Sequence, residues 1–177
     1  MSRLPGDPEP GEAMRRMIRV DQAGEYGARR IYAGQLAVLR GTPAEAKIRH
    51  MADQENRHLD MFEKLMVERR VRPTLLGPLW HVAGFALGAA TALMGEKAAM
   101  ACTEAVEEVI DEHYGRQSAV LDGDTALKSA VDESRADEIQ HRDTARASGA
   151  HEAPGYEVLT TVVKRASKLA IWLSERV

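Results

Sequence analysis

The segment DQENRH, residues 53–58, places Glu55 three positions before His58. In an α-helix, residues three positions apart lie on one face, so both side chains reach the same point. The Glu-x-x-His pattern returns at Glu138 and His141, in the segment EIQH. One copy arises often by chance, but two copies indicate an internal repeat of helices with equivalent polar faces.

Each copy is preceded by a glutamate at nearly the same distance. Glu25 lies 30 residues before Glu55, and Glu107 lies 31 residues before Glu138. Folding each helix back on its partner brings four carboxylates and two imidazoles together: Glu25, Glu55, His58, Glu107, Glu138 and His141. Ferritin-like di-metal bundles use this ligand set. The sequence therefore predicts an all-α fold, a ferritin-like four-helix bundle around two metal ions.

Start and stop signals divide the chain into helical segments. We expect helices at about 12–40, 42–71, 125–147 and 156–176, with a long apolar stretch at 75–95 that leads into a helix ending near 121. Thr42-Pro43-Ala44-Glu45 has the pattern of a capping box. Residues 1–13, rich in proline, are expected to be a disordered lead-in, and residues 14–177 one domain. The apolar and C-terminal helices are additions to the four-helix bundle.

Composition limits the function classes. Hydrophobic residues make up 44% and charged residues 29% of the chain, which is typical of a globular protein. The net charge of -3 argues against nucleic acid as the main partner, because no basic excess is available to displace counterions. The single Cys102 excludes an internal disulfide. The first residues lack the apolar core of a secretory signal, which favours the cytoplasm or its membrane face.

The ligand set favours iron without separating it from manganese, because both accept carboxylate and imidazole. Burying four acids without cations would be very costly. Asp137 is a candidate hydrogen-bond partner for a ligating histidine of the facing helix, with a solvated surface aspartate as the equal alternative. Tyr114 lies seven residues after Glu107 on the same helix face, so it is our candidate catalytic side chain, with a plain core tyrosine as the alternative. His113 is a weaker candidate.

The apolar stretch at 75–95 carries no charged side chain and is nominally long enough to span a bilayer. A span would separate Glu25 from Glu107, and the metal site would not assemble. We therefore expect this stretch to pack within the protein or to touch one leaflet. Its small residues Gly84, Gly88 and Ala92 permit close helix approach. The amphipathic final helix also favours peripheral contact with the cytoplasmic face of the cell membrane.

Several long blocks resemble the demethoxyubiquinone hydroxylases of ubiquinone biosynthesis. They are IRVDQAGEYGARRIYAGQ (18–35), DQENRH (53–58), RPTLLGPLWHVAGFALGAATAL (72–93), AMACTEAVEE (99–108) and AIWLSER (170–176). The resemblance covers nearly everything after residue 14. It implies that the six residues named above are the iron ligands, with Glu55 and Glu138 bridging, and that His113 and Tyr114 form the family's His-Tyr pair.

This resemblance implies a di-iron monooxygenase that hydroxylates the ring of demethoxyubiquinol with dioxygen and electrons from an unidentified donor. Its partners would be a polyprenylated quinol and the membrane surface, with a homo-oligomer and other ubiquinone-biosynthesis proteins left open. The main alternative is a ferritin-like ferroxidase or iron-binding protein. The uncharged stretch at 75–95 argues against this alternative, because an iron-storage subunit does not need a membrane-facing apolar entrance to its metal site. A manganese catalase and a metal-free interaction protein are weaker alternatives.

Overall fold

The computed structural model describes residues 10–177, and these residues form helices and connecting turns without any strand. The helices are α1 (Pro10–Val38), α2 (Glu45–Arg69), α3 (Gly77–Leu93), α4 (Glu96–Ser118), α5 (Thr125–Ala147), the short 3-10 helix η1 (Ala150–Glu152) and α6 (Tyr156–Ser174). The predicted all-α class is confirmed, and most predicted boundaries agree with the observed ones to within a few residues.

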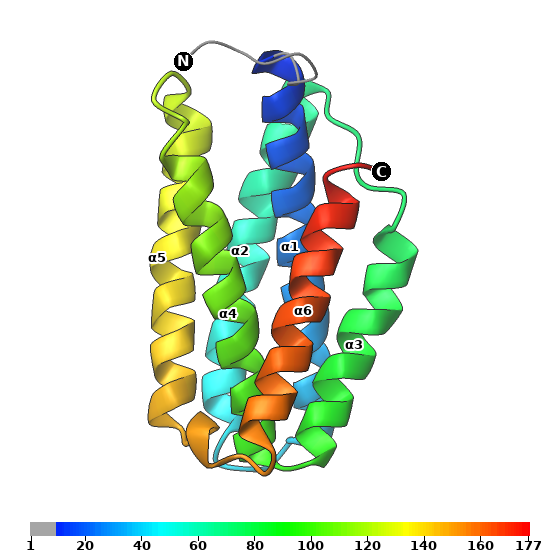
Figure 1. Ribbon diagram of the computed structural model, residues 1–177, viewed down its shortest axis with the longest axis vertical. Coiled ribbons are helices and arrows are strands. Elements are labelled where there is room, and N and C mark those ends of the chain that lie inside the picture. Colours follow the sequence, from blue (N-terminus) through cyan, green and yellow to red (C-terminus); the bar gives the residue numbers. More distant parts are fainter. Residues whose placement is uncertain (1–9) are drawn as a thin grey trace.

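Four long helices, α1, α2, α4 and α5, form the bundle, and two further helices lie outside it (Figure 1). The apolar helix α3 packs along α1, and the C-terminal helix α6 packs along α4. These are the two additional helices expected from the sequence. Among the described helices, none combines the length and the apolar character needed to cross a membrane.

Two local predictions need correction. Residues 10–13 belong to α1 rather than to a disordered lead-in, while residues 1–9 lie outside the described part of the chain. The capping box also fails, because residues 42–44 form a turn and α2 begins only at Glu45. The Glu45 carboxylate accepts the Gly41 backbone N–H at 2.7 Å, and the Thr42 hydroxyl forms no hydrogen bond.

The contact between α1 and α3 is a backbone contact, as the small-residue pattern predicted. A Cβ atom on Gly88 would lie 1.9 Å from the Ile31 carbonyl oxygen, and one on Gly34 would lie 2.2 Å from the Phe85 carbonyl oxygen. No side chain fits in either place. The apolar stretch is thus held against the bundle by glycine, and it ends where Gly95 adopts a φ of 113° before α4 begins.

Two hydrophobic clusters fill the bundle along its length. One includes Tyr32, Ile48 and Met100, and the other includes Phe62 and Leu127. Between them, near the middle of the four bundle helices, lie buried charged side chains, among them Glu25, Glu55, Glu107 and Glu138. The sequence positions of the predicted ligands fall in this middle section.

Candidate metal centre

All six predicted ligands lie in the bundle interior, each at 2% exposure or less. They form two groups, and within each group the potential ligand atoms lie within 4.8 Å of one another: Glu25, Glu55, His58 and Glu138 in the first, and Glu55, Glu107, Glu138 and His141 in the second. Glu55 and Glu138 belong to both groups. Two shared carboxylates between two separate histidines are the arrangement that a pair of neighbouring cations requires.

Several polar atoms of this cluster lack hydrogen-bond partners. Both carboxylate oxygens of Glu55, one oxygen each of Glu25, Glu107 and Glu138, and Nδ1 of His58 are buried without a hydrogen bond. Buried polar atoms in folded proteins are almost always satisfied, so such a concentration of unpaired acceptors calls for a cation. Hard and borderline cations such as iron and manganese accept this carboxylate and imidazole set. The residues present therefore fit a di-metal group.

Electrostatics point the same way. Burial, followed by the neighbouring carboxylates of Glu138 and Glu25, raises the pKa of Glu55 well above its ordinary value. Burial and Glu138 likewise raise the pKa of Glu107. Burial also opposes ionisation of Glu138, but the imidazoles of His141 and His58 beside it outweigh burial and lower the pKa of Glu138 to about 2. Cations at the centre would relieve the repulsion that these carboxylates otherwise exert on one another.

Each histidine is oriented by a residue of the facing helix. His58 Nε2 lies 3.0 Å from Asp137 Oδ2, and His141 Nε2 lies 3.2 Å from Gln54 Oε1. The other ring nitrogen, Nδ1, faces the carboxylates in both cases, at 3.4 Å from Glu138 for His58 and 3.2 Å from Glu138 for His141. The predicted hydrogen bond of Asp137 is confirmed, and both imidazoles present Nδ1 to the centre.

Comparison with known proteins gives the family of this chain. The sequence profile described as "Ubiquinone biosynthesis protein COQ7" matches residues 12–174. The chain belongs to this family. A 3-demethoxyubiquinol 3-hydroxylase from Rhodospirillum rubrum is 59% identical over 177 residues, covering 99% of the chain and 84% of that relative. The resemblance inferred from the sequence blocks is thereby confirmed.

Mitochondrial relatives match almost as much of this COQ7-family chain. The Homo sapiens NADPH-dependent 3-demethoxyubiquinone 3-hydroxylase is 50% identical over 169 residues, covering 93% of the chain and 78% of the relative. The Saccharomyces cerevisiae 5-demethoxyubiquinone hydroxylase is 44% identical over 180 residues, covering 92% and 77%. All three relatives are hydroxylases by name.

In this COQ7-family chain, two buried tyrosines contact the candidate ligands crosswise. Tyr114 of α4 donates a hydrogen bond to Glu25 of α1, and Tyr32 of α1 donates one to Glu107 of α4 at 2.7 Å. The predicted residue Tyr114 thus lies at the centre, and its catalytic role stays a prediction. Our sequence reasoning missed Tyr32, although Tyr32 follows Glu25 by the same seven residues that separate Tyr114 from Glu107.

His113 belongs to a neighbouring polar network rather than to the ligand set. Its Nε2 lies 3.3 Å from Asp21 Oδ1, and Gln117 Nε2 donates to the same oxygen at 2.7 Å. Burial raises the pKa of Asp21 to about 6. The remaining histidines, His50, His81 and His151, are exposed and lie outside both ligand groups.

Proposed function

We propose that this chain is a 3-demethoxyubiquinol 3-hydroxylase that binds two iron ions through Glu25, Glu55, His58, Glu107, Glu138 and His141. The observation that carries the proposal is the buried cluster of unpaired carboxylates in a chain whose relatives are hydroxylases of this name. Iron bound there would supply dioxygen activation and electron transfer, which no amino-acid side chain provides. The polypeptide itself binds the quinol, orients it and excludes water.

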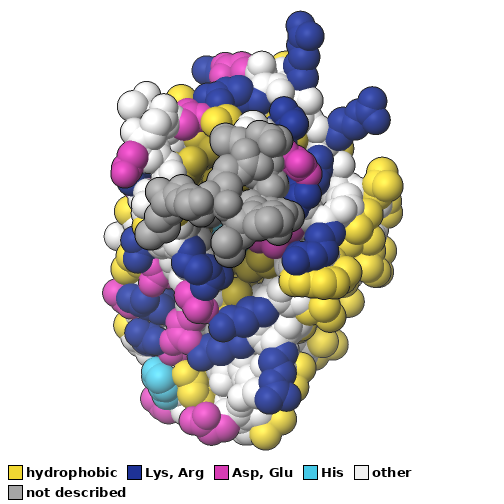
Figure 2. Space-filling view, turned by 45° about the horizontal axis from the view of Figure 1, so that its top comes forward, with side chains coloured by type: hydrophobic (Ala, Val, Ile, Leu, Met, Phe, Trp, Pro, Cys, Tyr) yellow, Lys and Arg dark blue, Asp and Glu magenta, His cyan; other side chains and the backbone are white. Residues whose placement is uncertain are grey.

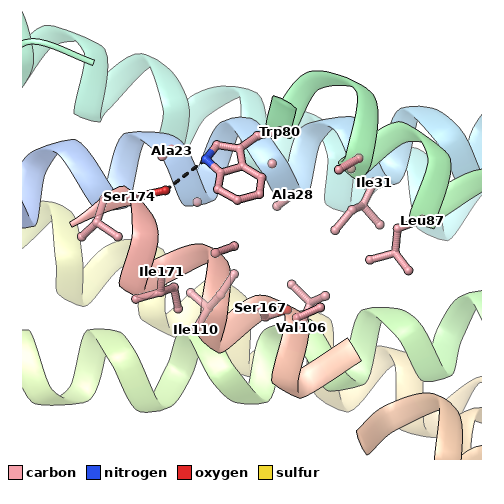
Figure 3. A pocket seen from close by; sticks show the side chains of 17 residues that line it. Ala23, Ala28, Ile31, Trp80, Leu87, Val106, Ile110, Ser167, Ile171 and Ser174 are labelled. Carbon is pink, nitrogen blue, oxygen red and sulfur yellow. Dashed lines mark hydrogen bonds between the residues drawn. The ribbon is translucent and has the colours of Figure 1, made fainter. Parts of the chain in front are cut away.

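An apolar cavity of about 160 Å³ is our candidate site for the quinol. Its walls come from α1, α3, α4 and α6, and Figure 3 shows Trp80 with its indole directed at Ser174. Trp80 Nε1 donates to Ser174 Oγ at 3.0 Å, joining α3 to α6 at this end. Gly24 and Val106 line the cavity, so it lies against the backbone that carries Glu25 and Glu107. An apolar site beside a polar centre suits a prenylated ring.

A second cavity, of about 510 Å³, adjoins the first and shares Val20 and Ile171 with it. His113 and Gln117 line it together with the cationic residues Arg16, Arg116 and Lys168. Each of these cations pairs with the carboxylate of Glu12 or Glu112, and Glu175 also lines the cavity, so its positive charge is balanced. We propose that the electrons come from NADPH, on which the human relative depends by its name.

The reaction then balances. One oxygen atom of dioxygen is inserted into a ring C–H bond of the quinol to give a hydroxyl group, and the other oxygen atom is reduced to water. Two electrons and a proton from the reduced nucleotide, with one further proton from solvent, complete the water. The buried tyrosines and histidines hold the carboxylates in place while this happens, and the bundle keeps bulk water away from the centre.

Contact with the membrane surface is the second part of the proposal. Most of the large apolar side chains exposed to solvent belong to α3 and α6 or follow them directly: Leu79, Val82, Leu93, Met94, Val158, Val162, Leu169 and Trp172. Figure 2 shows the apolar surface along the edge where α3 lies, with Lys and Arg side chains beside it. Such a surface suits peripheral attachment to a cytoplasmic membrane face.

A vesicle experiment tests the attachment. The double variant Val82→Ser/Val162→Ser should bind anionic phosphatidylglycerol vesicles about tenfold or more weakly than the parent chain, because it removes two exposed valines that would enter the membrane surface. The matched variant Val120→Ser, at a similarly exposed valine between α4 and α5, should bind normally. Equal binding of both variants in a flotation assay would contradict the proposed orientation.

Metal analysis and product analysis together test the hydroxylase. Protein purified without oxygen should contain about two irons per chain. With demethoxyubiquinol, NADPH and ¹⁸O₂ it should form a product that carries one labelled oxygen atom. Oxidation of added ferrous iron without any quinol product would instead support the ferroxidase alternative. Two manganese ions would keep the fold and remove the hydroxylase assignment.

A further inference from the structure

The centre repeats itself across the two halves of the chain. Glu55 and His58 of α2 correspond to Glu138 and His141 of α5, and Glu25 of α1 corresponds to Glu107 of α4. Tyr32 and Tyr114 also correspond, since each donates a hydrogen bond to the glutamate of the other half of the chain. Even the residues that orient the histidines correspond, because each directly precedes the glutamate of its own Glu-x-x-His motif.

This last pair breaks the symmetry. Asp137 supplies a carboxylate oxygen to His58 Nε2, whereas Gln54 supplies a neutral amide oxygen to His141 Nε2. The surroundings differ as well, because Gln54 is buried while the side chain of Asp137 is partly exposed and lies 3.6 Å from Arg57. A carboxylate that accepts a hydrogen bond from the outer ring nitrogen makes the inner nitrogen a stronger electron-pair donor to a metal ion. A neutral amide oxygen in the same place has a smaller effect.

We propose that Asp137 and Gln54 make the two metal positions unequal, so that the ion held by His58 binds more tightly than the ion held by His141. The inference rests on the proposed di-metal site and concerns residues outside the ligand set. Outer partners of ligating histidines typically change metal affinity by about 10–100-fold. The first metal ion to bind therefore occupies the position between Glu25 and His58, and the second completes the centre beside Glu107 and His141.

Titration of the metal-free chain with Co²⁺, followed by its visible absorption, tests the order. The parent chain should bind two ions in two resolved steps that differ by about tenfold or more. Asp137→Asn should weaken the first step by about tenfold and bring the steps together, whereas Gln54→Glu should strengthen the second step. Glu133→Gln is the matched control, since it removes a charge four residues from Asp137 on the exposed side of α5.

The possible outcomes distinguish the inequality of the two metal positions from the existence of the di-metal site. Crystals grown with one Co²⁺ per chain should show anomalous scattering beside His58. Two identical binding steps in the parent chain, or an ion found beside His141, would overturn the inequality while leaving the di-metal site intact. Equal weakening of both steps by Asp137→Asn and Glu133→Gln would reduce the effect to net charge and would also overturn it. Failure of the parent chain to bind any Co²⁺, Mn²⁺ or Fe²⁺ would remove the metal site itself.

Discussion

Replacing Glu55 by glutamine should abolish metal binding and hydroxylation while making the metal-free chain more stable. Glu55 belongs to both ligand groups, so its loss affects both metal positions. We expect hydroxylation to fall at least about a hundredfold, since in the proposed centre Glu55 would be a ligand of both ions, and outer partners of ligands alone cost about 10–100-fold. In the metal-free chain, the same carboxylate is buried among three others, and both of its oxygens lack a partner.

The pH dependence of this stabilisation has a definite sign. Because the folded-state pKa of Glu55 lies above its ordinary value of 4.5, the parent chain loses stability as the pH rises above about 4.5. The glutamine variant carries no such charge, so its advantage should be absent below pH 4.5 and should grow towards neutral pH. Urea unfolding of both chains in the presence of a chelator, at several pH values, measures the difference.

Glu138→Gln should lose metal and activity in the same way but shift the stability of the metal-free chain in the opposite direction. The pKa of Glu138 is lowered, because the imidazoles of His141 and His58 beside it outweigh burial. Its charge therefore stabilises the fold above pH 4.5, and the substitution should destabilise the metal-free chain at neutral pH. Glu108→Gln, next to the ligand Glu107 but turned towards Lys164, should keep both metals. Retention of two metals by Glu55→Gln would contradict the assignment.

The sequence predicted which residues gather at the candidate metal centre, because the spacing within each Glu-x-x-His motif is a local property of a helix. Glu55 with His58, and Glu138 with His141, face one direction in any α-helix, and the buried structure brings them together. Tyr32 was within reach of the same reasoning, since its distance from Glu25 repeats that of Tyr114 from Glu107. Applying the internal repeat to every residue of the motif, rather than to the ligands alone, would have found it.

Other features depend on how separate helices meet, which no local spacing reveals. The hydrogen bond between Gln54 and His141 joins residues 87 positions apart and requires the register between α2 and α5. The apolar cavity depends on how far α3 and α6 stand from the bundle, which is decided by close contact at Gly88 and by side chains such as Trp80. Helix α1 begins at Pro10, slightly before the start predicted near residue 12, because proline is tolerated in the first turn of a helix.

The contact at Gly88 leads to the second large effect. Gly88→Ala places a Cβ atom 1.9 Å from the Ile31 carbonyl oxygen, so the backbones of α1 and α3 must move apart. We expect a loss of about 2–3 kcal/mol of unfolding free energy, measured by urea denaturation. Gly77→Ala, in the same helix with no atom within 4 Å of its added Cβ, should leave stability unchanged or slightly raised.

The same substitution separates the cavity from the metal centre. Gly88 lies outside the ligand set, and Glu25 lies on the side of α1 that faces the bundle, so Gly88→Ala should retain about two irons per chain. The cavity between α3 and α6 should widen, because α3 forms one of its walls. Quinol binding should then weaken about tenfold or more, seen as a higher KM. A variant that loses its iron would show that α3 supports the centre directly, and one with parental stability and KM would contradict the backbone contact.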